Sequence, residues 1–276
     1  MSMTTTPGMP RWRRLLRAVR RVWVTAGAVS LLLMPVYAWW TYAPRLAAGA
    51  LASDSVVEIV QGTTLEARPR GPSRDVGLVW LTGCLVPAEA YLPLARDVAG
   101  RGYPVHIVAL PYWCAPLPGH RAEAMAHVRA LVASTPRRAW VLGGHSKGAT
   151  IACDVAADAP SSLRGLVLAG TTHPRDVDLS RTGLVVTKVV ATLDRVAPPA
   201  TSESRRHLLP RDATWVSIEG GNHSQIGWYG WQLGDGRATI SRDDQHRQLV
   251  EAVLDVLERV GRSDEPLPAT RGIIGG

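Results

Sequence analysis

Apolar residues occur in short runs along this chain, and the runs predict a β-sheet with helices between its strands. Residues 76–82 form a continuous apolar run, which is typical of a central strand covered on both faces. Residues 55–61 and 64–68 can pair as a hairpin. Further strands are expected at residues 103–110, 139–142, 163–169, 184–191 and 213–218. Helices are expected at residues 88–99, 120–134, 149–157 and 243–260. Because strands alternate with helices, the fold class is α/β, with a mostly parallel sheet and right-handed crossovers.

A long apolar stretch, residues 22–43, carries no charged side chain. About 20 apolar residues can span a bilayer, and aromatic residues stand near both ends of this stretch. Arginines are concentrated just before it, between Arg11 and Arg21, so the positive-inside rule places the N-terminus in the cytoplasm and the rest of the chain outside. We therefore expect a single-pass signal anchor in the cell membrane. The alternative is a signal peptide cleaved near Ala52, which would release a secreted protein.

These features divide the chain of 276 residues into five parts. The parts are a basic cytoplasmic segment (1–21), a transmembrane anchor (22–43), a linker (44–54), an α/β domain (55–260) and a flexible tail (261–276). The formal net charge is +8, but most of the excess lies in the basic segment, and the remainder carries about +2. Nothing in that balance points to nucleic acid, and the expected contact with the membrane is made by the N-terminal apolar helix.

Residues 144–148 read Gly-His-Ser-Lys-Gly, a G-x-S-x-G pentapeptide between an expected strand and an expected helix. In that context Ser146 takes a strained conformation, and its hydroxyl projects from the turn as a nucleophile. Strand and helix would then pass so close together that Gly144 and Gly148 must be small. His145 is expected to pack into the turn. The pentapeptide also occurs by chance in Gly-rich chains, so a catalytic role for Ser146 depends on whether the chain also supplies a base and an acid.

Two further residues complete a Ser-His-Asp set. Asp194 follows the expected strand 184–191, and His223 lies in a Gly-rich loop after the last expected strand. The order serine, aspartate, histidine is that of the α/β-hydrolases, and each residue follows a strand, where open α/β sheets place their sites. An imidazole can take the serine proton, and a carboxylate can fix the tautomer of that imidazole.

Alternatives remain at two of these positions. Asp176 or Asp178, after the preceding strand, could serve in place of Asp194. His173, which also follows a strand, competes with His223, but only His223 comes after the final strand.

From residue 57 to residue 257 the chain resembles the small, lidless serine hydrolases of the α/β-hydrolase superfamily that are related to dienelactone hydrolases. The matching stretches are Gly-Gly-His-Ser-Lys-Gly-Ala, Leu-Asp-Arg-Val-Ala-Pro-Pro and Ile-Glu-Gly-Gly-Asn-His-Ser-Gln-Ile-Gly-Trp-Tyr-Gly. The resemblance implies an α/β-hydrolase fold with helices on both faces of the sheet and no large lid. It also implies triad roles for Ser146, Asp194 and His223. Two departures are Lys147, where an apolar residue is more usual, and Cys84, where a small or apolar residue is common.

An oxyanion hole in such an enzyme uses two backbone N–H groups. We expect one from Lys147 and the other from Cys84, with Leu85 as the second choice. Cys84 could also pair with Cys114 in a disulfide, and two separate thiols are the alternative. Four aromatic residues in the surrounding loops could form an apolar rim for an acyl chain, or could be packing residues: Trp113, Trp228, Tyr229 and Trp231.

The function that these residues predict is hydrolysis of a carboxylic ester through an acyl-enzyme intermediate. The expected substrate is a small-molecule or lipid-like ester. No metal and no cofactor are expected, since no His/Cys pair has ligand spacing. The alternatives are an acyltransferase that uses the same triad and a non-catalytic membrane-anchored binding domain.

Overall fold

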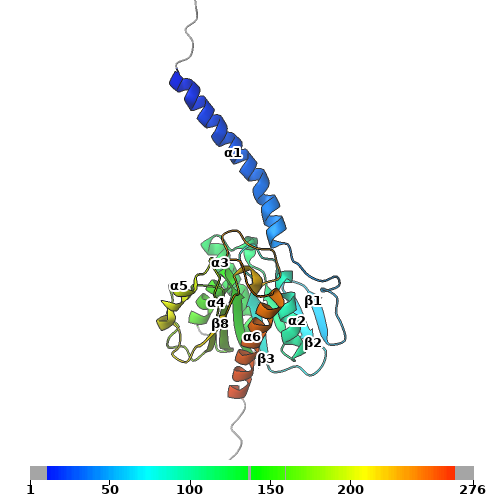
Figure 1. Ribbon diagram of the computed structural model, residues 1–276. Coiled ribbons are helices and arrows are strands. Elements are labelled where there is room, and N and C mark those ends of the chain that lie inside the picture. Colours follow the sequence, from blue (N-terminus) through cyan, green and yellow to red (C-terminus); the bar gives the residue numbers. More distant parts are fainter. Residues whose placement is uncertain (1–10, 136–137, 159, 265–276) are drawn as a thin grey trace, which may run out of the picture. The chain divides into compact units, whose positions relative to one another are not determined.

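The structure is a computed structural model that describes residues 11–135, 138–158 and 160–264. The chain divides into two units, with the boundary between Thr41 and Tyr42. Helix α1 (Arg11–Tyr42) has 32 residues and contains Pro35 (Figure 1). By length and composition it is apolar enough to cross a membrane.

The second unit is built on one sheet, which has eight strands within the described residues. Their spatial order is β1-β2-β4-β3-β5-β6-β7-β8. The strands are β1 (Val57–Gln61), β2 (Leu65–Pro69), β3 (Val76–Leu81), β4 (Val105–Val108), β5 (Ala139–His145), β6 (Leu163–Ala169), β7 (Val185–Ala191) and β8 (Thr214–Ile218). β1 pairs with β2, and β2 with β4, in antiparallel fashion, whereas every pair from β4 to β8 is parallel. The predicted hairpin and parallel sheet are therefore confirmed.

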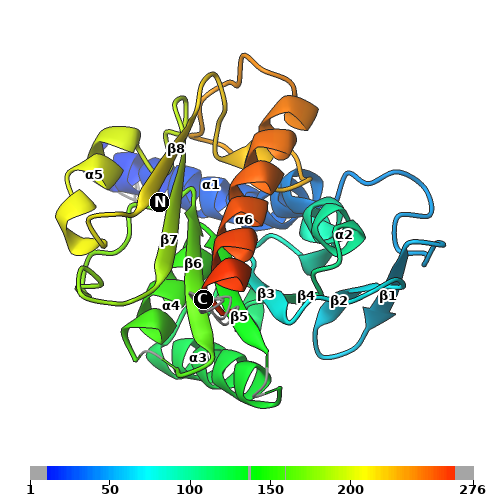
Figure 2. The same ribbon diagram turned by 90° about the horizontal axis from the view of Figure 1, so that it is seen from below.

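Helices cover both faces of this sheet, as Figure 2 shows. Successive residues of β3 alternate between the two faces. Leu78 and Trp80 join the core under α2 and α6, and Val79 and Leu81 join the core under α3 and α4. The helices are α2 (Leu92–Gly100), α3 (Pro118–Ala133), α4 (Lys147–Ala157), α5 (Pro199–Glu203) and α6 (Arg242–Asp264). The short 3₁₀ helices are η1 (Ala88–Tyr91), η2 (Pro111–Trp113), η3 (Arg206–Leu208) and η4 (Ser224–Ile226).

The parallel strands end together at one edge of the sheet. Leu81 lies beside Gly144, and Gly144 lies beside Leu168 in the next strand. Ala191 lies beside Ile218 at the far side of the same edge. The segments that follow β3, β5, β6, β7 and β8 therefore start close together, which brings residues far apart in the sequence to one place. Residues 170–184, all described, contain no helix or strand, in agreement with the lidless arrangement.

Residues 44–54, predicted as a linker, contain no helix or strand and are hydrogen-bonded to the α/β domain. The Arg45 N–H donates to the Trp228 carbonyl over 2.7 Å. Arg96 of α2 donates from Nε to the Ala50 carbonyl over 2.9 Å and pairs with Asp54 at 2.6 Å. The segment therefore packs on the domain along part of its length.

Candidate active site

The strained turn predicted at Ser146 is present between β5 and α4. Ser146 has φ 54° and ψ −116°, a conformation that non-glycine residues rarely adopt. A Cβ at Gly144 would lie 2.7 Å from the Ala149 nitrogen, and one at Gly148 would lie 2.4 Å from the Leu81 carbonyl oxygen. Both glycines are therefore required by the close approach of α4 to β5 and β3, as the sequence predicted.

Asp194 and His223 lie in direct contact, although 29 residues separate them. The Asp194 Oδ2 atom is 2.8 Å from His223 Nδ1, and the two residues are only 3% and 2% exposed. The other carboxylate oxygen accepts the N–H groups of Val196 at 2.9 Å and Ala197 at 2.7 Å. A carboxylate at Nδ1 favours the tautomer with its proton on that nitrogen, which leaves Nε2 as a proton acceptor.

Gly170, directly after β6, allows a close approach of His223 to the turn between β5 and α4, which is called the elbow below. A Cβ on Gly170 would lie 3.1 Å from the His145 ring and 3.2 Å from His223 Nδ1. The Ser146 N–H donates to the neighbouring Ala169 carbonyl over 3.0 Å, and the rings of His145 and His223 are 4.4 Å apart. Among the described residues, the Ser146 hydroxyl has no hydrogen bond to His223. Such contacts are often long in a free enzyme and tighten with substrate.

The residues that were alternatives to Asp194 and His223 lie in surroundings that do not form such a pair. Asp176 and Asp178 are exposed, and Asp178 accepts the Ser180 N–H over 2.8 Å within its own loop. His173 Nδ1 faces the Thr150 hydroxyl at 3.1 Å, and burial lowers the pKa of His173 to about 4. Neither aspartate therefore competes for His223, and His173 has no carboxylate to orient it among its described hydrogen-bond partners.

Buried polar residues that sequence reasoning missed hold the His223 loop. The carboxylate of Asp235 accepts hydrogen bonds from the Ser224 N–H at 2.9 Å, the Ser224 hydroxyl at 2.7 Å and the His223 N–H at 3.3 Å. Gln245 of α6 exchanges two hydrogen bonds with the Asn222 backbone, at 3.0 and 2.7 Å. The only sequence signal for Asp235 was its Gly-Asp-Gly setting, which carries no role by itself.

The loop after β3 contains three successive N–H groups with different partners. Gly83 donates to the Tyr91 hydroxyl over 2.9 Å, and Leu85 donates to the Trp113 carbonyl over 2.7 Å. Within the parts of the chain that the structure describes, the Cys84 N–H makes no hydrogen bond. Leu85, the second choice for an oxyanion donor, is therefore excluded, because its N–H is already used. Lys147 opens α4, where the first N–H groups have no partner within the helix.

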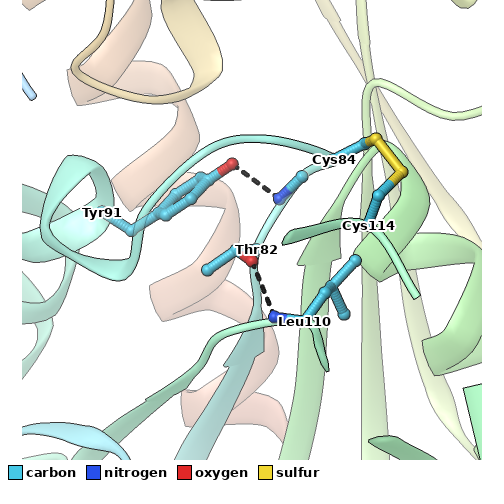
Figure 3. The surroundings of a disulfide bond; sticks show 6 residues. Thr82, Cys84, Tyr91, Leu110 and Cys114 are labelled. Carbon is cyan, nitrogen blue, oxygen red and sulfur yellow. Dashed lines mark hydrogen bonds between the residues drawn. A yellow bond between two sulfur atoms is a disulfide. The ribbon is translucent and has the colours of Figure 1, made fainter. Parts of the chain in front are cut away.

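Cys84 and Cys114 form the disulfide that the sequence left open (Figure 3). Cys153 is a buried thiol on α4, and burial raises its pKa to about 12.

Tyr91 and His145 connect the loop after β3 to the elbow. The Tyr91 oxygen accepts the Gly83 N–H and is hydrogen-bonded to His145 Nδ1, which lies 2.8 Å away. Burial, with a smaller contribution from His223, lowers the pKa of His145 well below its ordinary value. Burial likewise raises the pKa of the Tyr91 hydroxyl. His145 is thus neutral and packs in the turn, as expected, but it also supports the neighbouring loop.

The four aromatic residues predicted for a substrate rim differ in exposure. Trp113 is 65% exposed and precedes the disulfide residue Cys114. Tyr229 is fully buried and stacks on Tyr42 with 5.7 Å between ring centroids, so its place on a rim was wrong. Trp228 and Trp231 are half-buried, and the Trp231 indole donates to the Gly236 carbonyl over 3.2 Å. Only Trp113 therefore has the exposure expected of a rim residue.

The fold, a strained serine turn and a buried Asp-His pair at the carboxyl edge of a parallel sheet together define an α/β-hydrolase-type protein. A family model described as the alpha/beta hydrolase family matches residues 77–247, which is more than half of the chain. The chain belongs to this family. No match was found among curated proteins.

Solved structures with the same fold include several hydrolases. A predicted CIB-like hydrolase from Thermoplasma acidophilum has a TM-score of 0.55 at 13% identity, covering 72% of this chain and 97% of its own. A putative dienelactone hydrolase from Klebsiella pneumoniae has a TM-score of 0.51 at 15% identity, covering 74% and 98%. The esterase domain of a Rhodothermus marinus protein has a TM-score of 0.52 at 14% identity, covering 72% and 97%. At these identities the similarity establishes the fold alone.

Proposed function

We propose that this protein is a serine hydrolase that cleaves a carboxylic ester through an acyl-enzyme intermediate. The observation that carries the proposal is the buried Asp194–His223 hydrogen bond of 2.8 Å, formed at the sheet edge where Ser146 occupies its strained turn. A buried carboxylate on an imidazole stabilises the imidazolium that forms when the histidine takes a proton. A structural role alone would not require this pair beside a turn of such strain.

The proposed reaction has two proton transfers by His223. Its Nε2 takes the proton of the Ser146 hydroxyl while the oxygen attacks the acyl carbon, and the ester C–O bond breaks as Nε2 returns the proton to the leaving alcohol. Water then repeats the attack on the acyl-enzyme, with His223 as base and then as acid. Asp194 keeps the proton on Nδ1 throughout, and its second oxygen is held by two N–H groups, so that the imidazole keeps its orientation.

The negative oxygen of the tetrahedral intermediate would be bound by the N–H groups of Lys147 and Cys84. Lys147 lies at the N-terminal end of α4, where the helix dipole favours negative charge. The Cys84 N–H makes none of the described hydrogen bonds, whereas the N–H groups of Gly83 and Leu85 donate to Tyr91 and Trp113. Both donors are backbone groups, so they are in place before the charge develops.

The acyl group that fits this site is apolar. The two loops joined by the disulfide carry exposed apolar side chains, namely Leu85, Tyr112 and Trp113, which are 39%, 68% and 65% exposed. An ester with an alkyl or aryl acyl group would cover part of this surface, which favours its binding by the hydrophobic effect. The apolar α1 supports a location at the cell membrane, with the α/β domain outside the cytoplasm.

The test is replacement of the proposed nucleophile. Ser146→Ala should lower turnover of p-nitrophenyl butyrate by several orders of magnitude, as loss of a triad nucleophile does. It should also abolish labelling by a fluorophosphonate, whose labelled peptide in the wild type should contain Ser146. Ser73→Ala, at an exposed serine in a distant loop, is the matched control. Near wild-type turnover in Ser146→Ala would contradict the triad, and an unlabelled, inactive wild type would favour a binding domain.

A further inference from the structure

The disulfide joins two loops that follow neighbouring parallel strands. Cys84 lies in the loop after β3 and Cys114 in the segment after β4, 30 residues apart in sequence, with 4.3 Å between their Cα atoms (Figure 3). Nearer the strands, the Thr82 N–H donates to the Val108 carbonyl over 3.2 Å, and the Leu110 N–H donates to the Thr82 hydroxyl over 3.3 Å. The disulfide thus joins covalently two segments whose preceding strands, β3 and β4, are already paired in the sheet.

The two loops have backbone conformations that need such a restraint. Leu85, Tyr112, Trp113 and Ala115 all have positive φ, at 64°, 50°, 64° and 46°. None of them is glycine, so each is disfavoured by contact between its Cβ and the backbone. The side chains of Leu85, Tyr112 and Trp113 are exposed, although the Tyr112 ring stacks on His120 with 4.0 Å between ring centroids. Beyond the hydrogen bonds of Thr82, the described bonds that tie one loop to the other are the disulfide and the hydrogen bond from Leu85 to Trp113.

We propose that Cys114 is a positioning residue for the reaction, because its disulfide holds the Cys84 N–H in the oxyanion hole. The inference rests on the proposed function. The hydrogen bonds of Gly83 and Leu85 fix the residues on either side of Cys84, and the disulfide fixes Cys84 itself through its Cβ. Without that bond, the peptide that carries the Cys84 N–H would be held only by the hydrogen bonds of its own loop, in which the Val86 N–H donates to the Gly83 carbonyl over 3.2 Å, and the loop could shift this N–H away from the oxyanion. Such a donor acts in the transition state, so its misplacement should lower kcat more than it raises KM.

The experiment compares Cys114→Ser, Cys84→Ser and the double variant with the wild type. Each single variant should lower kcat for p-nitrophenyl butyrate by roughly 100-fold, the order seen when one oxyanion donor is lost, with KM changed by less than about threefold. Fluorophosphonate labelling of Ser146 should slow in parallel, because phosphonylation uses the same donors. The double variant should be no worse than either single variant, since both substitutions remove the same bond. Cys153→Ala, at the buried free thiol, is the matched control and should keep the wild-type kcat.

Reduction tests the same bond in folded wild-type protein, and so covers the case in which a variant fails to fold. A phosphine reductant converts the disulfide to two thiols while the phosphine is oxidised to its oxide. Cys84 and Cys114 are both half-buried and within reach of such a reagent. The treatment should lower kcat to the level of Cys114→Ser, oxidised glutathione should restore it, and the double variant should not respond.

Two outcomes would overturn the inference. If breaking the bond lowers the unfolding temperature but leaves kcat at its wild-type value, the disulfide only stabilises the fold. If the wild type neither hydrolyses esters nor labels at Ser146, the proposed function fails and the inference fails with it. An active, labelled wild type with an unchanged Cys114→Ser variant would instead leave the proposed function standing and remove the positioning role alone.

Discussion

Asp194 accepts hydrogen bonds at both carboxylate oxygens, from His223 at 2.8 Å and from the N–H groups of Val196 and Ala197. These bonds leave the carboxylate little freedom to turn, so the imidazole that faces it is held as well. An amide at this position would keep the size of the side chain. Because the second carboxylate oxygen accepts two backbone N–H groups, the amide oxygen would take that position, and the N–H₂ group would face Nδ1 and favour the wrong tautomer of the imidazole.

We therefore predict that Asp194→Asn folds normally but loses on the order of 10⁴-fold in kcat, by analogy with serine proteases. Asp176→Asn and Asp178→Asn are matched controls, because both side chains are exposed, and each should cost little activity. Steady-state kinetics on the three variants, with circular dichroism to check the fold, provide the measurement. If Asp194→Asn stays active and either Asp176→Asn or Asp178→Asn loses activity, the triad acid lies in the loop after β6 instead.

Lys188 of β7 is a buried charge that no sequence pattern indicated. It is 1% exposed, and its ammonium group donates to the backbone carbonyls of Thr171 and His173. Those carbonyls belong to the loop that follows Gly170, which contacts both His145 and His223. Lys188 thus supports the loop under the candidate site from the interior of the domain. Burial, partly offset by the nearby Cys153, lowers the pKa of Lys188 to about 8.

This shift has a consequence for stability at alkaline pH. Between pH 8 and 10.5 the unfolded chain keeps the Lys188 proton while the folded protein has released it, so the unfolded state binds more protons. The contribution of this group to the free energy of unfolding must then rise with pH, by about 3 kcal/mol over the window. Urea unfolding of the wild type and of Lys188→Met at pH 7.5 and pH 10 measures it. The difference in stability should move in favour of the wild type at pH 10, and an unchanged difference would contradict the buried charge.

At the scale of elements, the turn from β5 into α4 depends on the size of one residue. Gly148 lies so close to the end of β3 that a Cβ would be 2.4 Å from both the Leu81 and the Thr82 carbonyl oxygens. Both contacts are with backbone, which cannot rotate away as a side chain can. Adding a methyl group therefore has to separate α4 from β3, and β3 leads directly to the loop of Cys84.

Gly148→Ala should accordingly lower the free energy of unfolding by roughly 3 kcal/mol, as overpacking of a closed site does, and should lower kcat as well. Gly119→Ala is the matched control on α3, because nothing lies within 4 Å of its added Cβ. That change should be neutral or stabilising by up to about 1 kcal/mol, since alanine favours a helix more than glycine does. Thermal and urea unfolding compare the two variants. Equal stability of both would mean that the elbow is looser than described.

The elements themselves were largely predictable because their signals are local. Apolar runs marked the strands, and the glycine spacing around Ser146 marked the turn. The bounds shifted where proline chemistry intervened. The fourth strand, expected over residues 103–110, covers only Val105–Val108, between Pro104 and Pro111, because proline lacks the N–H that a strand ladder uses. The helix expected from residue 120 begins at Pro118, since proline fits the first turn of a helix.

The contacts around the candidate site were less predictable because they join residues distant in sequence. Tyr91 supports Gly83 and His145, Asp235 supports the His223 loop, and no spacing rule connects them. The exposure of Tyr229 was mistaken for the same reason, because its burial depends on neighbours such as Tyr42. The proximity of Asp194 and His223, in contrast, could be predicted from their order in the sequence and their positions after strands, because Asp194 follows β7 and His223 follows the neighbouring strand β8.

At the scale of the whole molecule, the two units have contrasting surfaces. α1 exposes large apolar side chains along its length, including Leu31, Leu32 and Leu33, whereas the α/β unit buries its apolar residues in two cores. An apolar helix of this kind is stable in lipid, where its backbone groups are satisfied internally. Its charge is asymmetric, with arginines from Arg11 to Arg21 and no charged residue from there to Pro44. By the positive-inside rule, we propose that the arginine end lies in the cytoplasm.

We therefore predict that the α/β unit of the full chain lies outside the cytoplasmic membrane. In bacterial spheroplasts that express the protein, added protease should digest this unit, while a cytoplasmic marker protein stays intact until the cells are lysed. Replacing the arginines between Arg11 and Arg21 by glutamine is the matched variant, because it removes the charge that sets the orientation and keeps the apolar span. Part of that population should become protected. Full protection of the wild-type α/β unit before lysis would show that the orientation is reversed, and a soluble protein that begins after Ala52 would show that the helix is cleaved as a signal peptide.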